Sequence, residues 1–319
     1  MGLEIALGIA VGIGLPLQTS INSRLKKRMN SPFRALFISF VVSLAFLVAV
    51  LLLTGQSLNI PFEALFKEKP WIWLGGVCGV VFLTGNILLL PKLGSAQTAV
   101  LPVLGQILMG LLIDNFGWFN SAVTKLTPMR IMGAVLVFAG VVVITLAKTP
   151  SDRPQKKQTD KLKSTHRAAG WVWKMFGIAA GMISAAQTAV NGHLGRTIGS
   201  PIKASYISFA VGATVLAVVV FVDCIRNRQN YKHQKCQSNS PWWMWSGGIL
   251  GAIYVLANVF LSGVLGTGLT VIVILMGTTA GGLLIDHFGW LGTRVSRLSF
   301  QKILGVVCMI CGAVIIRLL

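Results

Sequence analysis

The residues best suited to bind a ligand are carboxamides that stand inside apolar segments and recur at a fixed offset. Gln18 and Asn22 lie four residues apart, and Gln187 and Asn191 repeat this spacing 169 residues later. Residues four apart share one face of a helix. A carboxamide that faces lipid without a partner is costly. These four side chains therefore face other helices or a water-filled cavity, either as an interhelical polar clamp or as substrate-binding or gating groups.

Further polar residues follow the same repeat. Asn86 corresponds to Asn258, and Gln106, near the middle of an apolar segment, corresponds to Thr278. A carboxamide at mid-membrane depth can hydrogen-bond a solute or a neighbouring helix. We expect Gln106 to be the best single candidate for a substrate contact, with helix packing as the alternative.

Two acidic residues close apolar segments in the same context. Asp114 in LLIDNFGW and Asp286 in LLIDHFGW each precede an aromatic residue and Gly-Trp. One interpretation is an interfacial turn, with the carboxylate bonded to local backbone and Trp118 and Trp290 as interfacial anchors. The alternative is a role in ion coupling.

Small residues form a third pattern. GIAVG contains Gly8 and Gly12, and its repeat GIAAG contains Gly177 and Gly181. Glycines four apart let two membrane helices approach closely. We expect these four glycines to serve packing rather than substrate binding, and the helices that carry them to lie near the centre of the molecule.

Catalytic and metal-binding motifs are missing from the sequence. It contains no HExxH, no GxSxG and no phosphate-binding P-loop. Asp114 and Asp286 are expected at opposite membrane faces, which does not suit an aspartyl protease. Cys308 and Cys311 share a helix face without polar neighbours, so packing is expected of them. We therefore expect no enzyme, no cofactor and no metal site.

The segments that carry these residues are membrane helices. The chain has 319 residues, of which 54% are hydrophobic and 11% charged, against about 25% charged in soluble proteins. Apolar runs long enough to cross a bilayer recur along it. The net charge of +20 fits basic loops beside anionic lipid better than a nucleic-acid partner. The predicted helices cover 3–22, 33–54, 71–90, 95–113, 128–147, 173–193, 203–222, 243–262, 268–285 and 300–318.

The helices form two copies of one unit. Segments 18–40 and 187–209 are identical at 10 of 23 positions, and the repeat extends over nearly the whole chain. Because five helices per copy is an odd number, the second copy must enter the membrane from the other side. The predicted fold is an all-α integral membrane protein with ten transmembrane helices in two inverted five-helix repeats. The predicted divisions are 1–147, a basic cytoplasmic linker at 148–170, and 171–319.

Charge asymmetry predicts the orientation. Lys and Arg number 21 on the side of the linker and seven on the side of the termini. Positively charged loops face the cytoplasm. We therefore expect both termini to be extracytoplasmic.

The five-plus-five helices, the Gln-x-x-x-Asn pairs, the Ser-Pro that opens the second helix, ISF and IDHFGW together resemble the YdcZ-like branch of the drug/metabolite transporter superfamily. The resemblance covers both halves and implies a carrier of the bacterial inner membrane, often described as an exporter. The chain departs from small multidrug-resistance relatives, which have a membrane-centred Glu in the first helix. Its only acid there is Glu4, near the outer end, which speaks against Glu-based proton/cation antiport.

These observations predict a secondary transporter, an exporter of small organic metabolites or drugs that works by alternating access. The Gln18 pair would belong to an inner gate and the Gln187 pair to an outer gate. An importer or uncoupled facilitator stays open, as does a non-transporting protein such as a lipid scramblase or assembly partner. A cavity lined by Gln18, Asn86, Gln106, Asn191 and Thr278 would favour the carrier. The expected partners are a small-molecule substrate and the lipid bilayer, and a homodimer is left open.

Overall fold

Apolar segments fold as helices because a helix satisfies its own backbone hydrogen bonds where no water can do so. A computed structural model of the chain describes residues 2–57, 59–60, 62–146, 160–226, 241–265, 267–292 and 299–318, and these contain helices and no β-strand. The α-helices are α1 (Gly2–Met29), α2 (Pro32–Leu53), α3 (Phe62–Lys67), α4 (Leu74–Phe116), α5 (Pro128–Leu146), α6 (Asp160–Ile198), α7 (Pro201–Arg226), α9 (Ser246–Val264), α10 (Thr267–Phe288) and α11 (Phe300–Leu318). Short 3-10 helices are η1 (Pro70–Trp73), η2 (Trp118–Asn120), η4 (Trp242–Trp245) and η5 (Trp290–Gly292).

Every predicted helix falls largely on helical residues of the structure. Within the described part of the chain, seven helical segments are long and apolar enough to cross a membrane. Two shorter apolar helices, Pro128–Ile144 and Phe300–Ile316, and the less apolar α6 account for the other three predicted helices. The structure therefore shows an all-helical membrane-type fold, and ten as the number of spans stays a prediction.

Two helix ends differ most from the prediction. α1 continues to Met29 and includes the basic residues of its last turn, Lys26, Lys27 and Arg28, because cations suit a helix C-terminus. α6 begins at Asp160, so residues 160–170 of the predicted linker belong to a helix. Residues 148–159 of that linker lie outside the described residues.

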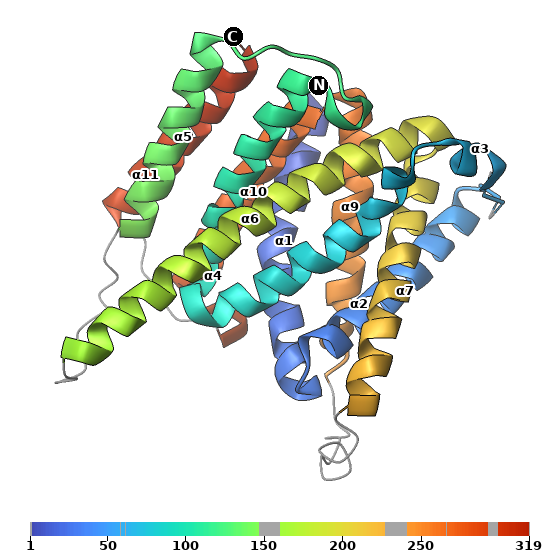
Figure 1. Ribbon diagram of the computed structural model, residues 1–319, viewed down its shortest axis with the longest axis horizontal. Helices are drawn as coiled ribbons and strands as arrows, with labels where there is room; N and C mark the ends of the chain where they lie inside the picture. Colours follow the sequence, from blue (N-terminus) through green and yellow to red (C-terminus); the bar gives the residue numbers. More distant parts are fainter. Residues whose placement is uncertain are drawn as a thin grey trace.

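A glycine divides α4 into two arms. Gly94 has φ 77° and ψ 173° inside a stretch that is otherwise helical, and side chains other than glycine rarely adopt such a backbone. The chain therefore reverses there, and the two arms correspond to the predicted third and fourth helices (Figure 1).

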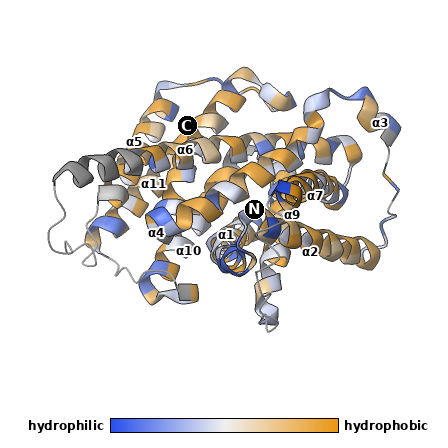
Figure 2. Cartoon of the chain, turned by 60° about the horizontal axis from the view of Figure 1, so that its bottom comes forward, coloured by the Kyte–Doolittle hydropathy of each residue, from blue (hydrophilic) through white to orange (hydrophobic). Residues whose placement is uncertain are grey.

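The helices pack in reciprocal pairs between the two halves. α1 lies against α10, and α6 lies against α4, while α5 pairs with α11 at one end of the molecule (Figure 1). Both chain ends lie at the same end of the view, and α6 starts at the opposite end. Apolar residues cover most of the helix surfaces, and hydrophilic ones concentrate at helix ends and connections (Figure 2). This hydropathy pattern suits helices that cross a bilayer.

Single contacts show the same reciprocity. Phe40 of α2 meets its equivalent Phe209 of α7 edge-on, with ring centroids 5.0 Å apart. In the α5–α11 pair, the backbone at Gly133 packs on that at Gly312, and Gly140 packs on Gly305. A contact from the first half to the second thus returns with the roles exchanged, as an internal two-fold relation would give.

Candidate functional site

The glycines predicted to mediate packing lie at helix contacts. A Cβ on Gly12 would overlap the backbone of α10, and a Cβ on Gly181 would overlap that of α4. Gly8 and Gly177 face side chains of the same two helices, α10 and α4, at closer range than a Cβ tolerates well. The predicted packing role agrees with these contacts, which bring the two halves together around the site.

The two glutamines occupy equivalent, closely packed positions. The Gln18 carboxamide lies against Gly251 of α9, and the Gln187 carboxamide lies against Gly79 of α4. Their side chains belong to residues that are only 2% and 8% exposed. Each glutamine therefore fills a groove left by a glycine of the other half.

The paired asparagines cross-link helices within their own halves. Ser39 Oγ donates to Asn22 Oδ1 at 2.7 Å, and Asn191 Nδ2 donates to Ser208 Oγ at 3.1 Å. Each asparagine also packs on a glycine at the start of α9 or α4. The two pairs are thus packed alike, but Asn22 accepts where Asn191 donates, and Gln18 Oε1, Asn22 Nδ2 and Asn191 Oδ1 have no hydrogen-bond partner.

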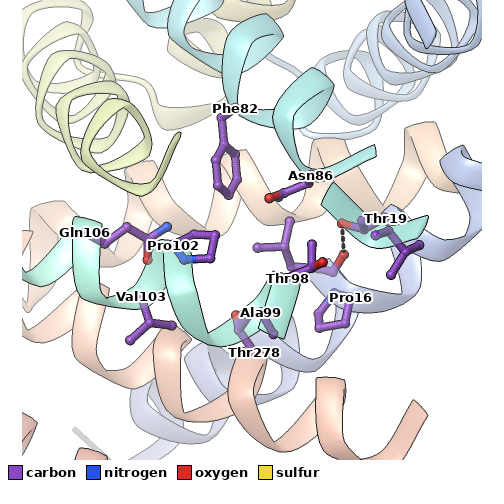
Figure 3. A pocket seen from close by; sticks show the side chains of 12 residues that line it. Pro16, Thr19, Phe82, Asn86, Thr98, Ala99, Pro102, Val103, Gln106 and Thr278 are labelled. Carbon is purple, nitrogen blue, oxygen red and sulfur yellow. Dashed lines mark hydrogen bonds between the residues drawn. The ribbon is translucent and has the colours of Figure 1, made fainter. Parts of the chain in front are cut away.

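Three of the predicted polar residues meet in one pocket. Asn86, Gln106 and Thr278 border a space of about 380 Å³ between α1, both arms of α4, and α10 (Figure 3). The space is narrow, wide enough for water molecules but too tight for a drug-sized solute. Gln18 and Asn191, also expected in this cavity, do not line it. The lining comprises Leu15, Pro16, Thr19, Phe82, Asn86, Leu90, Thr98, Ala99, Pro102, Val103, Gln106 and Thr278.

Two polar atoms in this pocket have no hydrogen-bond partner. They are Asn86 Oδ1 and Thr98 Oγ1, on residues that are 3% and 5% exposed. The other polar groups are engaged: Gln106 Nε2 donates to Ser184 Oγ at 2.9 Å, and Thr278 Oγ1 lies 3.2 Å from the Gly12 carbonyl oxygen. Unsatisfied buried polar atoms are costly, so Asn86 and Thr98 are available to a bound molecule.

The equivalent of Asn86 in the second half is in a different state. Thr188 Oγ1 donates to Asn258 Oδ1 at 3.4 Å, and Asn258 Nδ2 donates to the Tyr254 carbonyl oxygen at 3.4 Å. Asn258 is 6% exposed and does not line the pocket. The protein itself thus satisfies Asn258.

A buried ion pair lies beyond Gln106. Arg130 Nη2 stands 3.5 Å from Asp114 Oδ2, Arg130 Nε donates to the Ile316 carbonyl oxygen at 3.0 Å, and Nη1 donates to that of Thr124 at 3.1 Å. The pair borders a second pocket of about 470 Å³, which Gln106 also lines. Asp114 is therefore held by a cation as well as by its place at the end of α4.

Sequence reasoning missed the cations of this arrangement. Arg130 and Lys302 stand in the first turns of the predicted helices 128–147 and 300–318 and were counted with the adjoining loops, but they are only 3% and 4% exposed. Each follows its half's acidic residue, Asp114 or Asp286, by 16 positions, and Asp286 is likewise buried. This equal spacing of acid and base in both halves was the signal that could have found them. Thr98, whose hydroxyl lines the pocket, recurs as Thr270 at the offset that relates Asn86 to Asn258, and this recurrence was the signal for it.

Comparisons with known proteins address the chain as a whole. A family model described as "Putative inner membrane exporter, YdcZ" matches residues 3–143 and again 172–315, once in each half. A solved structure titled "Crystal structure of protein" is similar to the chain with a TM-score of 0.57 and 14% identity, over 98% of this chain and 96% of that one. At this identity the likeness concerns the fold alone. A search of curated proteins gives no significant match.

Proposed function

Because the chain belongs to the YdcZ family of inner membrane proteins in the drug/metabolite transporter superfamily, we propose that it is a secondary transporter that exports small organic solutes by alternating access. The family and the apolar helices make it an integral protein of the inner membrane, and the family's description as an exporter supports a transporter. The alternating-access mechanism, the direction of transport and the substrate class are what we propose.

The observation that carries the proposal is the pocket at Asn86. It lies between the two halves, since Thr278 comes from the second and the other lining residues come from the first. Transporters with internal repeats bind their substrates at such repeat interfaces. Two buried polar atoms without protein partners, on Asn86 and Thr98, give this pocket a reason to bind a solute.

The proposed cycle uses ten spans in two inverted halves. The pocket residues run from the middle of α1 and α4 toward the end where α1 joins α2. The equivalent region of the second half, around Asn258, is joined by hydrogen bonds. If the first half closed around Asn86 while the second half opened around Asn258, a solute would pass from one side of the membrane to the other. The Gln18–Asn22 and Gln187–Asn191 pairs, each packed at a glycine groove, are the proposed hinges or gates of that exchange.

The proposed orientation puts the pocket's end of the molecule in the cytoplasm and both termini outside. It rests on the excess of Lys and Arg on the side that includes the α1–α2 connection. A cysteine at Ser164, on a cysteine-free background, should resist a membrane-impermeant thiol reagent in intact cells, and one added at the C-terminus should react. Labelling of the Ser164 position without the C-terminal one would reverse the orientation.

The function is tested by a thermal-shift screen of the purified protein against a metabolite library. A ligand that binds the native pocket stabilises the fold by mass action. We expect compounds that raise the melting temperature of the parent protein but not of Asn86→Leu. Proteoliposomes should then show counterflow of the same compounds. Binding without counterflow would favour a non-transporting membrane protein.

Compounds found in this way can be used to determine the direction of transport and whether transport is coupled to an ion. Uptake into everted vesicles would support export, and uptake into intact cells would make the protein an importer. An imposed proton gradient distinguishes a coupled carrier from a facilitator. If the gradient drives transport and Asp114→Asn or Asp286→Asn abolishes only the driven component, these carboxylates couple the ion. If both variants keep driven transport, their role is structural.

A further inference from the structure

Among the described residues, the wall of the Asn86 pocket contains no ionisable side chain. Its described lining consists of aliphatic, aromatic and proline side chains with the hydroxyls and carboxamides of Thr19, Asn86, Thr98, Gln106 and Thr278. A charge placed in such a space would lose its hydration without gaining a counter-charge. The wall therefore suits an uncharged solute with an apolar body.

The two charges of the neighbouring pocket, which Gln106 also lines, are already engaged. Gln106 separates this pocket from the one that holds Asp114 and Arg130. The Arg130 guanidinium is shared among two backbone carbonyl oxygens and the Asp114 carboxylate. A carboxylate solute that reached past Gln106 would have to displace these contacts.

The free polar atoms define what the solute must present. Asn86 Oδ1 is an acceptor that needs a donor, and the Thr98 hydroxyl can give or take a hydrogen bond. Both residues are more than nine-tenths buried, and Figure 3 shows their side chains in the same pocket. The equivalent Asn258 finds a protein donor in Thr188, so an unpaired asparagine is not inherent in this position of the repeat.

From these observations we infer that the pocket binds an uncharged solute with a group that both donates and accepts hydrogen bonds, a carboxamide or a hydroxyl, on a small apolar body. The group would donate to Asn86 Oδ1 and accept from the Thr98 hydroxyl. Phe82, Leu90 and Pro102 would enclose the apolar part. This inference rests on the proposed function and specifies its substrate class.

The test uses probes of one shape that differ in a single group. Isobutyramide, isobutyrate and 3-methyl-2-butanone present an amide, an anion and an acceptor-only ketone on the same isopropyl body, and isobutylammonium adds a cation. Binding to the full-length protein in lipid nanodiscs is measured by calorimetry and by thermal shift. We expect isobutyramide to bind at least about tenfold more tightly than each of the others, because each lacks a donor or brings an uncompensated charge.

Variants show whether the difference arises in this pocket. Asn86→Leu and Thr98→Val should each reduce isobutyramide binding by about tenfold, the equivalent of one lost hydrogen bond. Thr214→Val is the matched control, because its hydroxyl donates to the Ala210 carbonyl oxygen on an exposed face of α7. It should bind isobutyramide as the parent does. If Asn86→Leu does not fold, Thr98→Val carries the test.

The outcomes separate the two proposals. Tighter binding of isobutyrate, isobutylammonium or the ketone that still depends on Thr98 or Asn86 would overturn the substrate class and leave the pocket as the binding site. Absence of binding, or binding that neither pocket variant changes, would overturn both the substrate class and the pocket on which the proposed function rests.

Discussion

Asn86 and Asn258 occupy equivalent positions of the two halves, yet their surroundings differ. Asn86 borders a pocket with an unpartnered side-chain oxygen, whereas Asn258 accepts a hydrogen bond from Thr188. Thr19, the equivalent of Thr188, donates to the Leu15 carbonyl oxygen of its own helix, as Thr188 does to that of Ser184, but only Thr188 also lies within hydrogen-bond distance of its asparagine, at 3.4 Å. The same residue types are thus joined in one half and apart in the other. We interpret the difference as two stages of one movement, with the pocket parted on the α1–α2 side and closed on the other.

Part of the difference between the two asparagine sites follows from neighbouring residues that are not the same in the two halves. Ser184 stands where the first half has Leu15, and Tyr254 stands where it has Phe82. Ser184 accepts a hydrogen bond from Gln106, so the second half has polar contacts that the first cannot form. The Thr–Asn pair, however, is present in both halves. Closure of Thr19 onto Asn86 is therefore chemically available to the first half as well.

The largest expected effect is on stability and concerns the buried cations Arg130 and Lys302, whose removal should destabilise both halves. Arg130→Met is expected to lower the free energy of unfolding by about 3 kcal/mol, because it removes the guanidinium from a buried carboxylate. Lys302→Met should destabilise in the same direction, since Lys302 is equally buried. Thermal unfolding in detergent measures both. The double change Asp114→Asn with Arg130→Met should recover most of the loss, and failure to recover it would show that the pair is not the cause.

The second prediction tests the shared frame of the halves. Gly105→Ala and Gly277→Ala each place a Cβ on a backbone carbonyl oxygen of the facing helix, and each should cost about 1–3 kcal/mol by overpacking. Gly110→Ala, on the same helix as Gly105, meets nothing within 4 Å and should be neutral or stabilise by up to about 1 kcal/mol. Thermal unfolding compares the three. A large effect in only one half would mean that the packing is not equivalent.

The smallest predicted effect concerns the paired glutamines, which pack alike in this structure. Gln18→Ala and Gln187→Ala should bias the transporter toward opposite open states by about 1 kcal/mol, the net value of a hydrogen bond. Thiol accessibility of single cysteines on the two sides reports the bias. A shift in the same direction for both variants, or none for either, would leave the pairs as structural clamps.

The sequence was sufficient for the frame of the molecule and for part of the site. Apolar segments and repeated motifs predicted the family and the helical fold, and paired glycines predicted the contacts at Gly12 and Gly181. Asn86, Gln106 and Thr278 were predicted as a group because each is a polar residue inside an apolar helix. Such residues in membrane proteins mostly face the bundle interior or a water-filled cavity. The family match bears on the chain as a whole, and the roles of these residues stay predictions.

Other features depended on contacts that no local pattern encodes. Arg130 and Lys302 were counted with the adjoining loops because the hydropathy of a segment does not show which surroundings its first turn has. Gln18 and Asn191 share the composition of the pocket residues but point at glycines of the opposite half, which only the packing of helices decides. α6 begins earlier than predicted because a polar helix has no apolar pattern to mark its start.

The central claim, that the two halves exchange open and closed conditions, is tested most directly by thiol reactivity at Thr98 and its equivalent Thr270. Single cysteines at these positions, on a cysteine-free background, are treated with an impermeant reagent in everted and right-side-out vesicles. We predict that Thr98→Cys reacts from the cytoplasmic side and Thr270→Cys resists. Adding Thr188→Val, which removes the donor to Asn258, should make Thr270→Cys reactive from outside and protect Thr98→Cys. Reactivity of both positions from the same side, or a joint rise in both, would contradict alternating access.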